Sequence, residues 1–181
     1  MPIDLEQLRA ARWPLDRAAA YAARCAQLRG CNYIPRNAIN PTQMWQDLDE
    51  KVIDQELGWA ASIGLNSLRV FLQYLVYEDN PAGLLDRMSR FLDIAARHGH
   101  STMFVLFDDC WGPEPTLGPQ PLPVPGVHNS GWTQSPGVTR RRPEHWQGLE
   151  SYVGSLLRRF AADERIIAWD LYNEAYTTTR P

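Results

Sequence analysis

The chain has 181 residues, which is enough for one domain with a sizeable core. Hydrophobic residues make up 44% and charged residues 22%, as in ordinary soluble globular proteins. The net charge is −3, without the excess of basic residues that is typical of nucleic-acid-binding proteins, so we expect no nucleic-acid partner. No apolar run reaches transmembrane length and no signal peptide is visible, so we expect no membrane partner. The default location is cytoplasmic, unless an export signal lies outside these residues.

The first 29 residues are predicted to form a helical segment. Apolar residues recur at helical spacing over 4–28, and Pro14 interrupts the pattern. We therefore expect one short helix and one longer helix that starts near Asp16. Gly30 is interpreted as the stop that ends the segment.

From residue 31 onward, predicted strands and helices alternate. Helices are expected from Asp49 or Asp54 to Gly64, from Pro81 to His98, and from Trp146 to Phe160, whereas 36–41 is interpreted as a turn-rich loop. Short, mostly apolar strands are predicted over the ranges 31–35, 66–72, 102–107 and 165–172. This order is typical of an α/β protein with a parallel sheet, either a barrel or a doubly wound sheet.

No motif in the chain indicates a cofactor or a structural metal. A G-x-G-x-x-G after the first strand and a P-loop are both absent from the sequence. The three cysteines, Cys25, Cys31 and Cys110, are odd in number and lack the spacing of metal ligands. We expect them to be buried free thiols.

A long irregular stretch, 112–143, follows the third predicted strand and holds eight of the fourteen prolines. Loops of this length inside a domain are usually functional or disordered. The side chains of Trp111, His128, Asn129 and Trp132 in and beside it argue against disorder.

The last predicted strand, 165–172, ends in Asn173 and Glu174. Its apolar run predicts burial on both faces, as in a parallel sheet. A glutamate at the carboxyl end of such a strand lies where α/β folds place their chemistry. Glu174 is therefore a candidate general acid, although a glutamate that caps a following helix has the same local pattern.

Arg69 lies inside the second predicted strand, where an unpaired guanidinium would be costly. It forms either a structural ion pair with Asp170 or Asp108, or a contact that orients a catalytic carboxylate. Polar or aromatic side chains also follow the other strand ends, namely Asn32, Tyr33, Asn37, Gln73, Tyr74, Asp108, Asp109 and Trp111.

These residues carry a resemblance to a known family. The Asn173-Glu174 pair, Arg69 in the second strand and the run 30–33 (Gly-Cys-Asn-Tyr) in the first resemble the first half of a clan A glycoside hydrolase. The closest type is the cellulase-like, family-5-like (β/α)8 barrel, also called a TIM barrel. The segments 126–132 and 134–137 resemble the long third-strand loop of bacterial members. The resemblance runs from about Cys31 to the end of the chain.

The resemblance implies roles for individual residues. Glu174 would be the acid/base, Asn173 would contact the hydroxyl next to the anomeric carbon, and Arg69 would support the nucleophile. Further substrate contacts are expected from Trp111, His128, Trp132, Tyr33 and Asp108. The implied reaction is retaining hydrolysis of a β-linked glycan, such as a glucan, mannan or xylan, through a covalent intermediate. Its partner would be an oligo- or polysaccharide.

Two departures from the family pattern leave alternatives open. Asp108 and Asp109 stand where members often carry a histidine, and the family's nucleophile, a glutamate on the seventh strand, has no counterpart here. We therefore expect residues 30–181 to be the N-terminal half of a catalytic domain in a longer protein. One alternative is a non-catalytic half-barrel that binds sugar or self-associates through its open edges. Another is a metal-dependent hydrolase that uses Asp108, Asp109 and His128.

Overall fold

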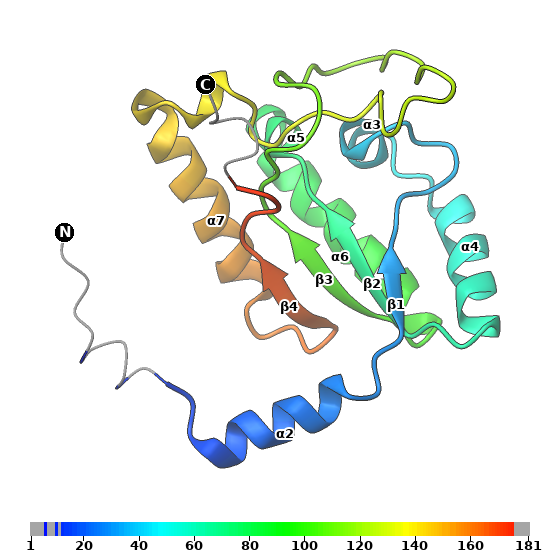
Figure 1. Ribbon diagram of the computed structural model, residues 1–181, viewed down its shortest axis with the longest axis vertical. Coiled ribbons are helices and arrows are strands. Elements are labelled where there is room, and N and C mark those ends of the chain that lie inside the picture. Colours follow the sequence, from blue (N-terminus) through cyan, green and yellow to red (C-terminus); the bar gives the residue numbers. More distant parts are fainter. Residues whose placement is uncertain (1–5, 7–9, 11, 176–181) are drawn as a thin grey trace.

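The centre of the molecule is one four-stranded parallel sheet (Figure 1). The computed structural model describes residues 6, 10 and 12–175. The strands are β1 (Gly30–Asn32), β2 (Ser67–Phe71), β3 (Ser101–Val105) and β4 (Ile166–Asp170), and they follow one another across the sheet in sequence order. Each neighbouring pair is parallel, which confirms the predicted α/β class. Consecutive order is that of the first four strands of a (β/α)8 barrel.

Three long helices connect the strands and lie together on one face of the sheet (Figure 1): α4 (Glu50–Ser62), α6 (Pro81–Arg97) and α7 (Trp146–Phe160). The hydrophobic core lies between these helices and the sheet. In β2, Leu68 and Val70 are buried in this core, whereas Arg69 between them is only half-buried on the opposite face. Burial therefore alternates along the strand, and the opposite face corresponds to the inside of a barrel. In the described part of the chain no helix has the length and apolar character needed to cross a membrane.

Local capping signals explain where the long helices begin. The side chain of Asn80 accepts a hydrogen bond from the backbone N–H of Gly83 at 2.9 Å, and Pro81 occupies the first helical position of α6. Asp49 caps α4 in the same way through the N–H groups of Lys51 and Val52, each at 3.1 Å. Of the two predicted starts for this helix, Asp49 is therefore the right one.

Two short helices were not predicted: α3 (Pro41–Gln46) and α5 (Tyr74–Asp79). Asn40 caps α3 by accepting from the N–H of Gln43 at 3.0 Å, and Gln73 caps α5. The predicted loop 36–41 therefore ends one residue early, at Asn40. Both helices lie beyond the carboxyl ends of the strands (Figure 1). There, Gln46 of α3 and Tyr74 of α5 form hydrogen bonds with Gly118 and Ser135 of the stretch 112–143.

The N-terminal segment contains α2 (Leu15–Cys25), which starts directly after Pro14 as predicted. The interpretation of Gly30 as its stop is wrong, because α2 ends at Cys25 and Gly30 belongs to β1. A Cβ at position 30 would lie 2.6 Å from the carbonyl oxygen of Ser67, so glycine allows β1 and β2 to approach. The shorter helix predicted before Pro14 lies almost wholly outside the described residues. A domain boundary at residue 30 stays a prediction.

The two outer strands differ from their predictions. β1 ends at Asn32 instead of Pro35, since a proline has no N–H to continue the ladder. The prediction that the last strand is buried on both faces was wrong, because only Ile167 of β4 is buried. Within the described residues β4 has a strand neighbour on one side only. Among the predicted buried thiols, Cys110 is buried, Cys25 is half-buried and Cys31, in the outer strand β1, is exposed.

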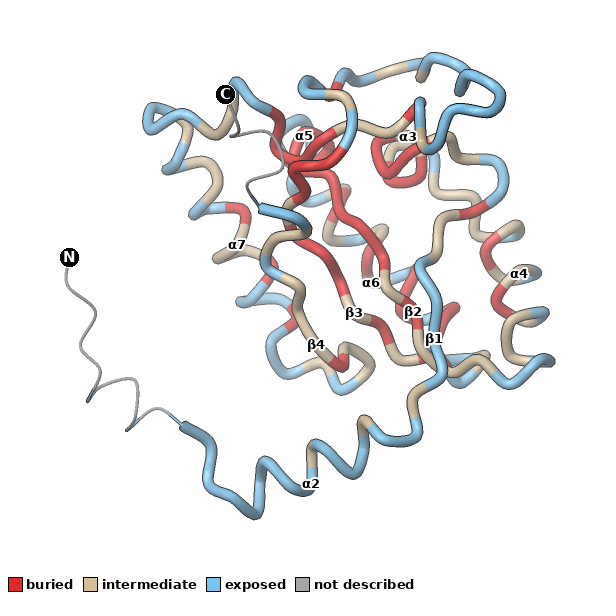
Figure 2. The backbone as a smooth tube through the Cα atoms, viewed as in Figure 1, coloured by how far each residue is buried: buried red, intermediate tan, exposed pale blue. Residues whose placement is uncertain are grey.

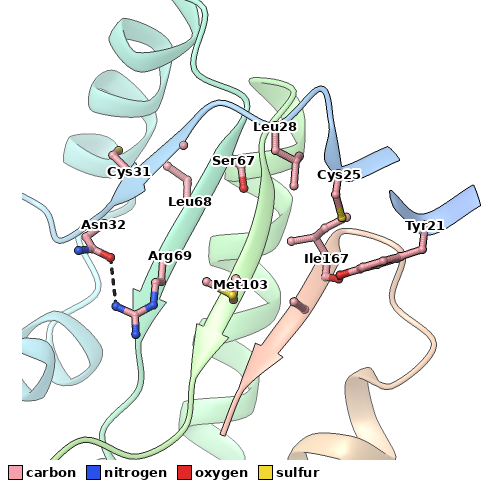
Figure 3. Close-up of a pocket in the computed structure, with 12 residues that line it drawn as sticks. Tyr21, Cys25, Leu28, Cys31, Asn32, Ser67, Leu68, Arg69, Met103 and Ile167 are labelled. Atoms are coloured by element: carbon pink, nitrogen blue, oxygen red, sulfur yellow. Dashed lines mark hydrogen bonds between the residues drawn. The ribbon is translucent and has the colours of Figure 1, made fainter. Parts of the chain in front are cut away.

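The free edge of β4 is irregular and partly covered by α2. The register passes from Thr102–Ile166 to Met103–Ala168, which leaves Ile167 without a partner on β3. The hydroxyl of Tyr21 donates to the carbonyl oxygen of Ile167 at 2.9 Å. A cavity of about 610 Å³ lies between α2 and the inner face of the sheet (Figure 3). We assign this cavity to the interior of the partial barrel.

Candidate active site

Arg69 of β2 brings the ends of three strands together. Its guanidinium forms an ion pair with the Asp170 carboxylate, with Nε and Oδ2 3.2 Å apart, and Nη2 donates to Oδ1 of Asn173 at 2.8 Å. A longer contact of 3.3 Å reaches Oδ1 of Asn32 in β1, and Figure 3 shows these two side chains facing each other. The guanidinium carbon also lies 4.6 Å from the ring centre of Phe71. Of the two structural partners considered from the sequence, Asp170 is the one that pairs with Arg69.

The amide of Asn173 is held on both sides, which fixes its orientation. Its oxygen must face Arg69, because a guanidinium only donates, and its Nδ2 donates to Oδ1 of Asp108 at 2.9 Å. Nδ2 also contacts the sulfur of Cys110 at 3.7 Å. Sulfur is a weak acceptor, so one N–H of this amide has only a weak partner.

Asp108 lies behind Asn173 and is 3% exposed. Burial raises the pKa of its carboxyl above the ordinary value, although the hydrogen bonds from Asn173 and from the N–H of Cys110 partly oppose this. Asp108 does not line the cavity described below. Its position supports Asn173, and the predicted contact between Asp108 and substrate stays a prediction.

Glu174 follows directly and is exposed. It lies four residues beyond β4, which ends at Asp170 and is shorter than the predicted strand 165–172. Its backbone has a φ of 48°, a conformation that is uncommon for a residue other than glycine. The thiol of Cys110 hydrogen-bonds to the Glu174 carboxylate, and burial together with this bond raises the pKa of Cys110 to about 12. The thiol therefore stays protonated near neutral pH and can donate to Glu174.

A cavity of about 360 Å³ opens beside Glu174 at the carboxyl ends of the strands. Seven of the eight predicted site residues line it: Tyr33, Arg69, Trp111, His128, Trp132, Asn173 and Glu174. Five further residues complete the lining: Asn32, Ile34, Phe71, Cys110 and Asn129. Convex loops seldom gather so many polar and aromatic side chains, and a concave site of this size is typical of a ligand pocket.

Aromatic side chains form one wall of this cavity. The rings of Trp111 and His128 meet edge to face with centroids 5.0 Å apart, and Trp132 meets Phe71 in the same way at 5.4 Å. Tyr33 donates its hydroxyl to Glu56 at 2.9 Å, and burial raises the pKa of this phenol, so it stays protonated. Trp111 is exposed and Trp132 is half-buried, and both line the cavity, where an indole face is well suited to stack on a sugar ring.

The long loop 112–143 is folded back onto the strand ends and crosses above them in Figure 1. Backbone hydrogen bonds join Gly112 to Trp132 and Asp108 to Ser135. The fully buried Asn40 donates to the carbonyl oxygen of Gly131 at 2.8 Å. The loop thus has a defined conformation, which agrees with the prediction that it is not disordered.

Cys110 and Asn129 also line the cavity and were not predicted as site residues. A single cysteine after a strand gives no signal beyond burial. Three other strand-end residues considered from the sequence lie elsewhere. Gln73 caps α5 and donates to the carbonyl oxygen of Gln134, Asn37 contacts Asp49, and Tyr74 is buried in α5, where its ring packs on Tyr152.

The metal alternative is not supported by the arrangement of its side chains. Among the described residues no three histidine, cysteine or carboxylate side chains gather into a group that could hold a metal ion. Asp109 instead pairs with Arg141 at 2.6 Å and accepts from the hydroxyl of Tyr172 at 2.7 Å.

Fold and site together define a partial (β/α)8 barrel with a polar and aromatic pocket at the carboxyl ends of its strands. No protein-family model and no curated protein matches the chain. Solved structures do match. The exo-β-1,4-mannosidase Op5Man5 from Opitutaceae bacterium strain TAV5 is 24% identical with a TM-score of 0.55, over 81% of this chain and 24% of its own.

Two proteins named GH5_18 match in the same way. The one from Bifidobacterium longum subsp. longum ATCC 55813, solved with Manβ1-4GlcNAc, is 16% identical with a TM-score of 0.56, over 80% of this chain and 33% of its own. The one from Streptomyces cattleya is 18% identical with a TM-score of 0.52, over 77% of this chain and 32% of its own. The chain thus spans about a quarter to a third of the structures it matches. At this identity the match confirms the fold alone, which is part of a (β/α)8 barrel.

Proposed function

We propose that this chain supplies the acid/base half of the active site of a glycoside hydrolase that acts on β-linked glycans. The observation that carries the proposal is the position of Glu174, which follows β4 and lines a pocket with an aromatic wall. Glu174 lies beside Asn173, whose amide is oriented by hydrogen bonds with Arg69 and Asp108. The fold match to glycoside hydrolases that include mannosidases supports it.

In the proposed mechanism, Glu174 gives a proton to the glycosidic oxygen as the bond to the anomeric carbon breaks. The weakly bound N–H of Asn173 donates to the neighbouring sugar hydroxyl, where it can displace the contact with Cys110. Arg69 keeps the amide oxygen turned away from the substrate. Trp111 and Trp132 stack on sugar rings.

A second carboxylate is needed for retaining hydrolysis, since a nucleophile must form the glycosyl-enzyme intermediate. We propose that it comes from a later strand of the same barrel, outside the four strands described. In the second half of the reaction Glu174 then removes a proton from water, which attacks the anomeric carbon and releases the nucleophile.

β-Mannosides are the substrates that we propose to test first. One structural neighbour is named as an exo-β-1,4-mannosidase, and another was solved with Manβ1-4GlcNAc. Aryl β-mannosides, β-glucosides and β-xylosides form the comparison set.

The test compares Glu174→Gln with wild type in protein expressed from the complete coding sequence. We expect kcat/KM to fall by about 10²- to 10⁴-fold, the usual contribution of general acid–base catalysis. Glu150→Gln is the control, because Glu150 is an exposed residue of α7. A Glu174→Gln enzyme with full activity on every glycoside in the set would exclude the proposed role.

A sugar-binding half-barrel without catalysis is the second candidate, and the aromatic wall of the pocket favours it. It predicts that wild type binds mannobiose by calorimetry but hydrolyses no glycoside. Catalysis that depends on Glu174 excludes it.

A further inference from the structure

Asp109 connects the ends of β3 and β4 to the long loop. Its side chain is nearly buried, with 5% exposure, and its carboxylate pairs with Arg141 at 2.6 Å. The same oxygen accepts from the hydroxyl of Tyr172 at 2.7 Å. Arg141 ends the 3-10 turn Thr139–Arg141, on the return arm of the loop.

The backbone of Asp109 adds two more connections. Its N–H donates to the carbonyl oxygen of Asn173 at 3.2 Å, and its own carbonyl oxygen accepts from Nε2 of the fully buried Gln134 at 2.9 Å. Asp109 therefore contacts the two residues directly before Glu174, one through its side chain and one through its main chain.

Glu174 needs such support because its φ of 48° is unfavourable for a residue with a side chain. Tyr172 is held further by its ring, which packs on Phe107 with centroids 5.5 Å apart. Burial and the bond to Asp109 raise the pKa of the Tyr172 phenol, so it remains a donor. A conformation of this kind persists when several contacts determine it.

We propose that Arg141, Asp109 and Tyr172 form a positioning network that sets Glu174 at the angle needed for proton transfer. Because Arg141 belongs to the loop that carries the aromatic wall, the network also places the acid/base and the sugar-binding wall relative to each other. This inference rests on the proposed function. None of the three residues lines the cavity, so they act through Glu174 and not on the substrate.

Tyr172→Phe is the sharpest test, since it removes one hydroxyl and keeps both the ring packing and the Arg141–Asp109 pair. We expect kcat on mannobiose to fall by about 10- to 100-fold with KM little changed, as for a misplaced catalytic group. On a 2,4-dinitrophenyl β-mannoside, whose leaving group needs no proton, kcat for bond cleavage should stay within about twofold.

Tyr77→Phe is the matched control. Its hydroxyl donates to Ser155 at 2.9 Å, and the buried side chain lies between α5 and α7 and does not line the cavity. A purely structural role for the network predicts that Tyr172→Phe behaves as Tyr77→Phe on both substrates, and this result would overturn the inference.

Arg141→Lys is the second variant, to be used if Tyr172→Phe does not fold. It keeps the charge beside Asp109 but loses the geometry of the guanidinium. If Arg141→Lys lowers kcat on mannobiose but not on the 2,4-dinitrophenyl β-mannoside, the result supports the network. An equal fall in kcat on both substrates contradicts it. Glu174→Gln is measured alongside. If it retains activity, the proposed function fails; if it loses activity while both network variants match the control, only the network fails.

Discussion

Arg69 is the residue that joins the strand ends into one site. It touches Asn32, Asp170 and Asn173, and its half-buried guanidinium lies opposite a similarly half-buried carboxylate, with 23% and 24% of the side chains exposed. Removing one partner of such a pair leaves a charge without compensation, whereas removing both is less costly.

We therefore predict strong coupling between Arg69 and Asp170. Arg69→Met should lower the free energy of unfolding by about 2 kcal/mol, and the double variant with Asp170→Asn should lose less than the two single changes combined. Urea unfolding of the four proteins measures the coupling. Additive losses would mean that the pair is not an energetic unit.

His100 is a residue whose protonation should affect stability. It is 3% exposed, and neither ring nitrogen has a hydrogen-bond partner in the described part of the chain. Burial lowers the pKa of its imidazole below the ordinary value. At pH values between the pKa of His100 in the folded state and its pKa in the unfolded state, the unfolded state binds more protons. The contribution of neutral His100 to stability is therefore present at neutral pH and is lost as the pH falls below about 6.5.

The corresponding prediction is that His100→Phe, which keeps an aromatic ring of similar size, reduces the loss of stability between pH 7 and pH 5. Thermal unfolding at both pH values checks it. The control is His128→Phe, because His128 lies on the cavity wall. His98→Phe is unsuitable as a control, since His98 contacts Asp54. An unchanged pH dependence in His100→Phe would contradict this account of His100.

At the scale of elements, the site depends on how the long loop is held. Asn40 performs two tasks: its Oδ1 caps α3 through the N–H of Gln43, and its Nδ2 donates to the loop at Gly131. Loss of a helix cap costs about 1 kcal/mol, and loss of a buried hydrogen bond costs a similar amount.

We predict that Asn40→Ala lowers the free energy of unfolding by about 2 kcal/mol and exposes the loop to proteolysis. Thermolysin should cut first near Leu122, which is 84% exposed. The control is Asn37→Ala, which removes an exposed contact with Asp49. Equal cleavage rates in the two variants would show that Asn40 does not hold the loop.

Elements with strong local signals could be predicted from the sequence. Asn80 and Pro81 predict the start of α6, and the same Asn-Pro signal at Asn40 and Pro41 marks α3, but the surrounding turn residues led to a loop prediction. α5 was missed because its buried run, 74–77, shows no helical alternation.

The site was predicted in part for a similar reason. Asn173 and Glu174, which follow the last strand, could be predicted because parallel strands bring their carboxyl ends to one edge of the sheet. Arg69 could be predicted because a guanidinium inside a strand needs a partner. The contacts of Asp109 with Arg141 and Gln134 could not, since they depend on how the long loop returns across the strands. The contact between Cys110 and Glu174 could not either, because a single cysteine after a strand indicates no more than burial. Sequence spacing contains no information about that path.

At the scale of the whole molecule, the sheet has two free edges and an open inner face within the described residues. Figure 2 shows β1 exposed, while β2 and β3 are largely buried. An open strand edge favours pairing with another chain. The irregularity at Ile167 and the hydrogen bond from Tyr21 both make the edge of β4 less available.

We predict that Tyr21→Phe in the 181-residue chain increases self-association, because the carbonyl oxygen of Ile167 loses its donor. Stability should fall by about 1 kcal/mol, the usual effect of one hydrogen bond. Sedimentation velocity over a range of concentrations measures the association. The same monomer fraction in wild type and variant would show that α2 does not protect this edge.

We propose that Glu174 is the acid/base of a retaining glycoside hydrolase. Azide rescue of Glu174→Ala, in protein from the complete coding sequence, tests this role with 2,4-dinitrophenyl β-mannoside as substrate. This substrate forms the glycosyl-enzyme without a general acid, and azide can then attack the anomeric carbon without a general base. We predict that azide accelerates turnover and that the product is the β-mannosyl azide. No acceleration, or an α-azide product, would contradict it.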